Sequence, residues 1–189
     1  MTLQQRIAPT LHSARFTVAE IYALQESGAI DDADNFELIE GEIVPMAAAK
    51  FNHHEWMKSA LVRAFVLATA KETGVFVEPS VTLSADTLLE PDIAIWPRKI
   101  GTQDVRGTDM LLVIEVAVSS IGYDLRVKAP LYARAGVCEY WVVDAVRKTV
   151  RIHREPVAGK YADVNEWEVN DALAPMKIPG VSFSLSDLD

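Results

Sequence analysis

A carboxylate interrupts the most apolar stretch of this chain and limits how the chain can fold. Residues 111–118 are all hydrophobic except Glu115. A continuous apolar run of this length predicts a strand buried on both faces, so we place it at the centre of a sheet. Burying an unpaired carboxylate is costly, and we therefore expect a positive charge beside Glu115. That charge belongs either to a bound cation or to an Arg or Lys side chain in a structural ion pair.

The length and the cysteine content favour one ordinary globular domain. The chain has 189 residues, of which 50% are hydrophobic and 24% charged, so we expect a single domain over residues 1–189. The single cysteine, Cys138, cannot form an internal disulfide and is expected to be an inert buried thiol. We expect a cytoplasmic protein without a membrane anchor, because the start shows no secretory segment and no apolar run approaches the roughly 20 residues of a spanning helix.

The charge is unevenly distributed along the chain. The formal net charge is −9, which argues against a protein that binds nucleic acid over its whole surface. Residues 98–154 nevertheless hold ten Lys or Arg against six Asp or Glu. These basic residues either lie on solvated helix and hairpin faces or form a dedicated phosphate-binding surface.

Hydrophobic periodicity and turn residues predict helices interspersed with strands. After a loose arm over residues 1–15, we expect a short helix from Thr17, a long helix over 52–73 and a third over 123–135. Pro130 lies inside the third helix, so we expect a kink or a late start there. The predicted strands are 36–40, 42–46, 75–83, 92–96, 111–118, 139–143 and 149–153, with a polar hairpin at 161–169. This order predicts an α/β (α+β) fold with one mixed central sheet flanked by helices.

Asp92 is the natural companion of Glu115. It begins a short predicted strand directly after Pro91, although Asp is a poor strand former. Two carboxylates on adjacent strands would make a site for Mg²⁺ or Mn²⁺, ions that bind through one or two carboxylates and keep several waters for the substrate. Ala117 lies on the same strand face as Glu115 and leaves room for the ion. Taken alone, Asp92 would be interpreted as a turn residue that caps the loop.

Lys128 lies on the helix that is expected to follow the strand of Glu115. A helix that folds back would bring this lysine over the strand end, where it could orient or help to deprotonate an attacking water and stabilise charge on a phosphate. Asp124 and Lys128 also stand four residues apart, as solvent-exposed helix pairs commonly do, and that alternative stays open.

A series of short motifs runs in order through residues 36–144. They are the segment 36–43 (FELIEGEI), His54 at a helix start, Pro91-Asp92 before a β run, residues 113–116 (VIEV) with Ser119-Ser120, Asp124 and Lys128, and residues 132–144 (YARAGVCEYWVVD). This series resembles the putative restriction endonuclease family, formerly a domain of unknown function. The resemblance implies a restriction-endonuclease-like fold of the PD-(D/E)xK nuclease superfamily, with a nuclease-like core over 36–144 and divalent-metal-dependent cleavage of phosphodiesters.

The resemblance also implies roles for three charged residues. Asp92 matches the Asp of the Pro-Asp pair, and Glu115 matches the second acidic metal ligand. Ala117 stands where the superfamily's strand pattern has a lysine, which is a departure from that pattern. Lys128 matches the relocated lysine of this family, whose side chain could return to the same place.

Two further residues carry less defined roles. The resemblance implies Glu37 as an accessory acid near the metal and matches His54 to the helix-opening histidine of the family, without a role. The pair His53-His54 lacks the spacing of a zinc-binding helix. Glu37 is alternatively a solvent-facing strand residue, and His54 a hydrogen-bonding residue at the helix start.

We predict a metal-dependent endonuclease that hydrolyses DNA with Mg²⁺ or Mn²⁺ held by Asp92 and Glu115. The alternative is a non-catalytic interaction or regulatory module on the same fold, because superfamily membership alone does not establish activity. The acidic net charge and the missing strand lysine favour the module, whereas Asp92, Glu115 and Lys128 together favour the enzyme. RNA or another phosphoester is not separated from DNA by the sequence. A symmetric homodimer would help to cut both strands of a duplex.

Overall fold

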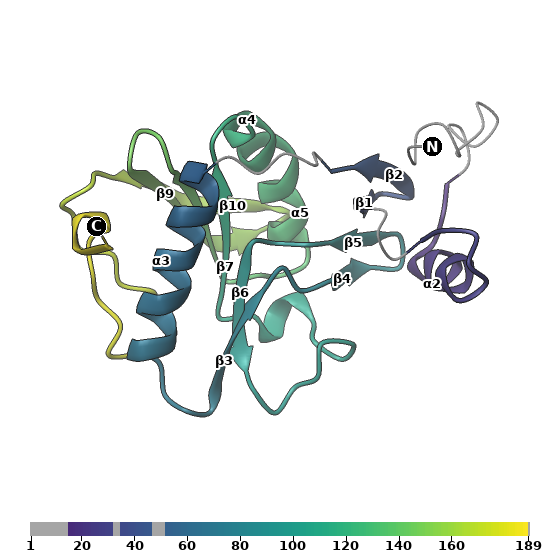
Figure 1. Ribbon diagram of the computed structural model, residues 1–189, viewed down its shortest axis with the longest axis horizontal. Coiled ribbons are helices and arrows are strands. Elements are labelled where there is room, and N and C mark those ends of the chain that lie inside the picture. Colours follow the sequence, from purple (N-terminus) through teal and green to yellow (C-terminus); the bar gives the residue numbers. More distant parts are fainter. Residues whose placement is uncertain (1–14, 32–34, 47–51, 189) are drawn as a thin grey trace. The chain divides into compact units, whose positions relative to one another are not determined.

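The computed structural model describes residues 15–31, 35–46 and 52–188, which belong to two compact units. The first unit consists of Met1–Ala49 and Ser80–Glu90, and the second of Lys50–Pro79 and Pro91–Asp189. Figure 1 shows the helices and strands of both units. The loose arm expected over residues 1–15 lies outside the described residues except for its last residue.

The first unit contains a helix and a small antiparallel sheet. Helix α2 begins with the expected capping box, in which the Thr17 N–H donates to the Glu20 carboxylate and the Glu20 N–H donates to the Thr17 hydroxyl. The turn of the predicted hairpin has both Glu40 and Gly41 at positive φ, 49° and 85°, as a tight hairpin turn requires. The elements are α2 (Val18–Glu26), β1 (Phe36–Ile39), β2 (Glu42–Pro45), β4 (Val81–Ser84) and β5 (Thr87–Leu89), in the sheet order β2-β1-β5-β4.

The second unit is built on a mixed six-stranded sheet. Its strands are β3 (Thr73–Val77), β6 (Ile93–Pro97), β7 (Leu112–Ala117), β8 (Glu139–Asp144), β9 (Thr149–Val157) and β10 (Lys160–Trp167). They stand in the order β10-β9-β8-β7-β6-β3, and β7 and β8 form its parallel pair. Every residue of β7 is buried, so Glu115 lies inside the sheet, as the apolar run predicts.

Helical segments cover both faces of this mixed sheet. Helix α3 (Asn52–Ala68) shares a hydrophobic cluster with Ile114 and Val116 of β7. Glu115 alternates with these residues and points to the opposite face, where the segment 121–134 supplies its partners. None of the helices in the described part of the chain combines the length and the apolar composition that a membrane span requires.

Pro130 lies within a continuous helical segment and accounts for its unusual geometry. The segment consists of α4 (Ile121–Tyr123), the π-helical η3 (Asp124–Lys128) and α5 (Ala129–Arg134). Proline has no N–H to return to the preceding turn. Immediately before it, the Ala129 N–H donates to the carbonyl of Asp124, five residues back, and the helix widens there. A π turn therefore takes the place of the expected kink or late start, and π turns are frequent at functional sites.

Three sequence-based boundaries are wrong. Helix α3 ends at Ala68 rather than at residue 73, because no apolar residue continues its stripe beyond that point. The single strand expected over 75–83 is two strands, because Glu78 has a φ of 50° and Pro79 supplies no ladder donor. The described residues consequently form two sheets rather than the one expected. The polar stretch expected as a hairpin is the single strand β10, which pairs with β9.

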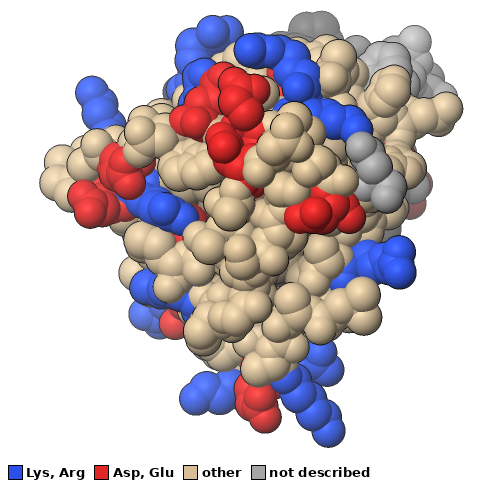
Figure 2. Space-filling view, turned by 90° about the vertical axis from the view of Figure 1, so that its left-hand side faces the viewer, with Lys and Arg blue, Asp and Glu red and all other residues tan. Residues whose placement is uncertain are grey.

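Two short turns complete the second unit. Two 3₁₀ turns, η2 (Gly107–Asp109) and η4 (Leu185–Leu188), precede β7 and end the described chain. Figure 2 shows the side of the unit on which the C-terminal segment lies. Charged residues of both signs lie mainly around its edges, and the middle carries mostly uncharged residues. This face does not present a continuous basic surface.

His153 makes the stability of the fold dependent on pH. It is buried on β9, with its ring 5.4 Å from that of Tyr140 and 5.6 Å from that of Tyr161, and burial lowers its pKa below the ordinary value. Since the unfolded chain binds the proton more tightly, the contribution of His153 is complete above about pH 6.5 and is lost as pH falls toward the folded-state pKa. Urea unfolding at pH 7.5 and 5.0 should show a larger acid loss for the wild type than for His153→Gln. Equal losses would contradict this, and His53→Gln, on an exposed residue, is the control.

Candidate active site

Asp92 lies directly before β6, and Glu115 lies on the neighbouring strand β7. Strands β6 and β7 pair antiparallel with Ile93 opposite Ile114, and Asp92 immediately precedes this first paired residue of β6. The Val116 N–H donates to Oδ2 of Asp92 at 2.8 Å, which ties this carboxylate to β7. The start of β6 and the middle of β7 therefore position both predicted acids.

Glu115 is bound by two side chains of the helical segment. Lys128 Nζ and the Tyr132 hydroxyl each donate to Oε1 of Glu115 at 2.9 Å. All three residues are buried, with Glu115 4% exposed, Lys128 6% and Tyr132 0%. The positive charge expected beside Glu115 is thus supplied by Lys128. The alternative of a solvent-exposed pair with Asp124 is wrong, because Asp124 is itself buried and accepts a hydrogen bond from the Ser120 hydroxyl at 2.8 Å.

The first turn of α3 brings His54 to Asp92. Nε2 of His54 lies 3.1 Å from Oδ1 of Asp92, and its Nδ1 lies 3.0 Å from Oε1 of Glu55. Ionised carboxylates only accept hydrogen bonds, so two such neighbours favour the doubly protonated, positively charged imidazole. The hydrogen bond to Asp92 is the main cause that raises the pKa of His54, while burial opposes it.

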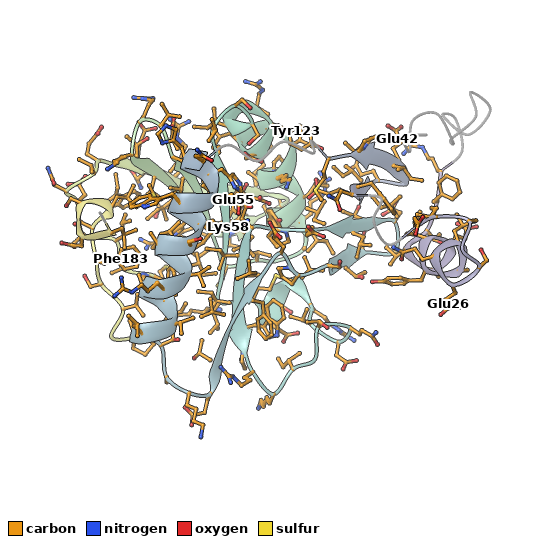
Figure 3. All side chains as sticks on the ribbon, viewed as in Figure 1. Glu26, Glu42, Glu55, Lys58, Tyr123 and Phe183 are labelled. Carbon is orange, nitrogen blue, oxygen red and sulfur yellow. The ribbon has the colours of Figure 1, made fainter. Side chains whose placement is uncertain are left out.

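Lys58 extends this arrangement one turn along α3. Its Nζ donates to Oε1 of Glu55 at 3.0 Å and to Oε1 of Glu78 at 2.7 Å, and the residue is buried. Figure 3 shows Glu55 and Lys58 on the side of α3 nearer to β6 and β7, away from Phe183. Burial acts to lower the pKa of Lys58, but the hydrogen bonds to Glu78 and Glu55 and the charges of Glu78 and Asp92 raise it. Lys58 is therefore held as an ammonium.

Glu37 belongs to the first unit. Its carboxylate accepts a hydrogen bond from the Glu90 N–H at 3.2 Å, and the residue is 2% exposed. The alternative of a solvent-facing strand residue is therefore wrong. Its role as an accessory acid stays a prediction.

The chemistry of the two acids fits a hard divalent cation. Among the described residues, no group of three or more His, Cys, Asp or Glu side chains is placed to hold a metal ion. Mg²⁺, however, is commonly bound by one or two carboxylates, with waters and substrate oxygens completing its octahedron. A carboxylate offers about four lone-pair sites, and the contacts of Asp92 to Val116 and His54 use two of them, so its oxygens keep capacity for a cation.

Sequence reasoning missed several residues that the structure brings to this site: Glu55, Lys58, Glu78 and Tyr132. A signal existed for two of them. Lys58 follows His54 by four residues and precedes the core residue Leu61, so it falls on the buried stripe of the helix. Tyr132 follows Lys128 by four residues and shares its helix face. Glu78 had no signal, because its approach to Lys58 depends on the chain reversal at Pro79.

A separate groove of about 440 Å³ lies between α3 and the C-terminal turn η4. Trp56, Arg63, Leu67 and Leu188 are among the residues that line it. None of the candidate site residues lines this groove.

Comparisons with known proteins agree with the fold described above. The model of the Uma2 family, described as "Putative restriction endonuclease", matches residues 18–186 of this chain. The crystal structure of a putative nuclease belonging to DUF820 from Anabaena variabilis is similar with a TM-score of 0.72 and 18% identity, over 92% of this chain and 97% of that chain. The type IIG restriction endonuclease BpuSI matches with a TM-score of 0.35 and 21% identity, over 55% of this chain and 11% of its own. No curated protein matched the chain. The family match and the similarity to the DUF820 structure thus confirm the predicted restriction-endonuclease-like fold class.

The buried pair of Glu115 and Lys128 should be strongly coupled in stability. Lys128→Met leaves the buried carboxylate without its cation, and it should lower the free energy of unfolding by about 3–5 kcal/mol in the presence of chelator. The double variant Glu115→Gln/Lys128→Met removes both charges and should recover most of that loss. Urea unfolding of the wild type, Glu115→Gln, Lys128→Met and the double variant measures this.

The control for this cycle is a more exposed pair, Arg151 and Glu166, with side chains 39% and 32% exposed. Glu166→Gln should cost less than about 1 kcal/mol. A similarly small cost for Lys128→Met would show that Lys128 is not what makes the burial of Glu115 tolerable.

Proposed function

We propose that this chain, which belongs to the Uma2 family of putative restriction endonucleases, is a metal-dependent endonuclease that hydrolyses phosphodiester bonds in DNA. The observation that supports the proposal is the buried pair of Glu115 and Lys128, next to a β7 residue that binds Asp92. The ammonium of Lys128 lies 2.9 Å from Glu115, and the N–H of the adjacent residue Val116 donates to the Asp92 carboxylate at 2.8 Å. Two acids and a lysine from three different elements would be an expensive arrangement to bury for structure alone.

The proposed roles follow from the chemistry of these groups. Asp92 and Glu115 would hold Mg²⁺ or Mn²⁺, which would polarise the phosphoryl oxygen and lower the pKa of an attacking water. Lys128 would orient that water and stabilise the charge that develops on the phosphate. The Tyr132 hydroxyl shares Oε1 of Glu115 with Lys128 and keeps the carboxylate in one orientation. Glu37 would serve as an accessory acid. Cleavage of both strands needs two sites, so the assembly proposed on duplex DNA is a symmetric homodimer.

Nicking of supercoiled plasmid tests the proposal. Purified wild type should convert supercoiled DNA to open circles with Mn²⁺ or Mg²⁺ and should not do so with chelator. Asp92→Asn keeps the shape of the side chain and removes a charged ligand, so the rate should fall by about 10²–10³-fold. Lys128→Met should reduce the rate to a similar degree, because it removes the cation from the same site.

Lys160→Met is the matched control, because Lys160 is exposed on β10 and is not one of the site residues described above. It should nick DNA at the wild-type rate. Thermal melts in chelator should show that each variant is folded at the assay temperature. A wild type that binds DNA without cutting it, or variants as active as the wild type, would favour a non-catalytic module. Labelled RNA in the same assay separates the two nucleic acids.

A further inference from the structure

A closed loop of hydrogen bonds and ion pairs includes Asp92. Oδ1 of Asp92 lies 3.1 Å from Nε2 of His54, and Nδ1 of His54 lies 3.0 Å from Oε1 of Glu55. Nζ of Lys58 donates to Oε1 of Glu55 at 3.0 Å and to Oε1 of Glu78 at 2.7 Å. The Glu78 N–H donates to the carbonyl of Asp92 at 3.1 Å and closes the loop. The loop begins and ends at Asp92, and acidic and basic side chains alternate along it.

His54 is the side chain of this loop that contacts the Asp92 carboxylate. The two nitrogens on opposite sides of its imidazole bind two carboxylates, so the imidazole cannot rotate without breaking a charge-assisted hydrogen bond. The other oxygen of Asp92 is held by the Val116 N–H. His54 and β7 together determine the orientation of the Asp92 carboxylate.

Lys58 is too buried to act on a substrate directly. It is 6% exposed, and its ammonium lies between Glu55 and Glu78. Glu55 and Glu78 are more exposed, with side chains 44% and 32% accessible, and the ammonium of Lys58 binds both of them. The strained backbone of Glu78, with a φ of 50°, is a further sign that the surroundings determine its conformation.

We propose that His54 is a positioning residue for Asp92, and that Lys58 acts through Glu55 to hold His54 in place. This inference rests on the proposed function, because it assigns to Asp92 the role of a metal ligand. Residues that hold a ligating carboxylate contribute to metal affinity without touching the metal, and their removal typically weakens binding by about 10–100-fold. His54 and Lys58 therefore prepare the orientation of Asp92 before a divalent cation arrives.

Calorimetric titration of the full chain with Mn²⁺ tests this role without an activity readout. His54→Leu removes both hydrogen bonds of the imidazole, and it should weaken Mn²⁺ binding by about 10–100-fold. His54→Gln restores one amide donor near Asp92 Oδ1 and should recover most of the wild-type affinity. The matched control is His53→Leu, the same substitution on the exposed neighbouring residue, and it should bind Mn²⁺ as the wild type does.

Lys58 is tested by a double-mutant cycle in the same titration. Lys58→Met alone should weaken Mn²⁺ binding. The double variant His54→Leu/Lys58→Met should bind no more weakly than His54→Leu, because Lys58 acts through a residue that is already removed. Thermal melts in chelator identify a variant that fails to fold. If His54→Leu fails, His54→Ala against His53→Ala carries the comparison, and His54→Ala should bind Mn²⁺ more weakly.

The possible results separate this inference from the proposed function. A wild type that does not bind Mn²⁺ overturns both. A wild type that binds Mn²⁺ and loses it in Asp92→Asn supports the metal site. In that case equal affinity of His54→Leu and His53→Leu overturns only the positioning role. A His54→Gln variant that binds as weakly as His54→Leu also overturns it, because the hydrogen bond to Asp92 would then not be what matters.

Discussion

The burial of Glu115 is the constraint on which the second unit is organised. Its carboxylate is in a strand with every residue buried, between β6 and β8. An isolated charge there would cost several kcal/mol, so the sheet is stable only when the covering helix supplies compensation. Lys128 and Tyr132 supply it from one helix face, at 2.9 Å each. The position of the helical segment 121–134 on the sheet is therefore linked to the charge inside the strand.

The π turn before Pro130 contains one of the two residues that compensate the buried charge of Glu115. Lys128 is the last residue of the π-helical stretch, and Tyr132 lies one turn further on, in α5. Proline removes a backbone donor, and the wider turn before it lets the chain accommodate that loss without ending the helix. Both side chains that meet Glu115 thus come from the turns on either side of Pro130. The same proline that conflicts with a regular helix lies between the two partners of the buried acid.

Sequence patterns revealed the acids more readily than the residues that hold them. Glu115 stood out because it contradicts its surroundings, and Asp92 because a poor strand former follows Pro91 at a strand start. Both depend on local sequence alone. Lys58 and Glu78 meet only because β3 ends at a left-handed residue and the chain then leaves the sheet, so their contact depends on tertiary structure. The same break explains why the number of sheets was not predicted. Nothing in the local pattern around residue 79 distinguishes a bulge within one strand from the end of a strand.

The lysine lies on a helix rather than on the strand, and the small side chain of Ala117 makes room for that helix. Residues 115 and 117 lie on the same face of β7, two residues or about 6.5 Å apart along the strand. Ala117 is fully buried, and its small side chain leaves the space above this face to the helical segment. A lysine at position 117 would bring a second ammonium toward Glu115, and it would compete with Lys128 for one carboxylate in a dry environment, where like charges repel strongly. This strand carries alanine where a lysine would crowd the site, so the side-chain cation that contacts Glu115 comes from the helix.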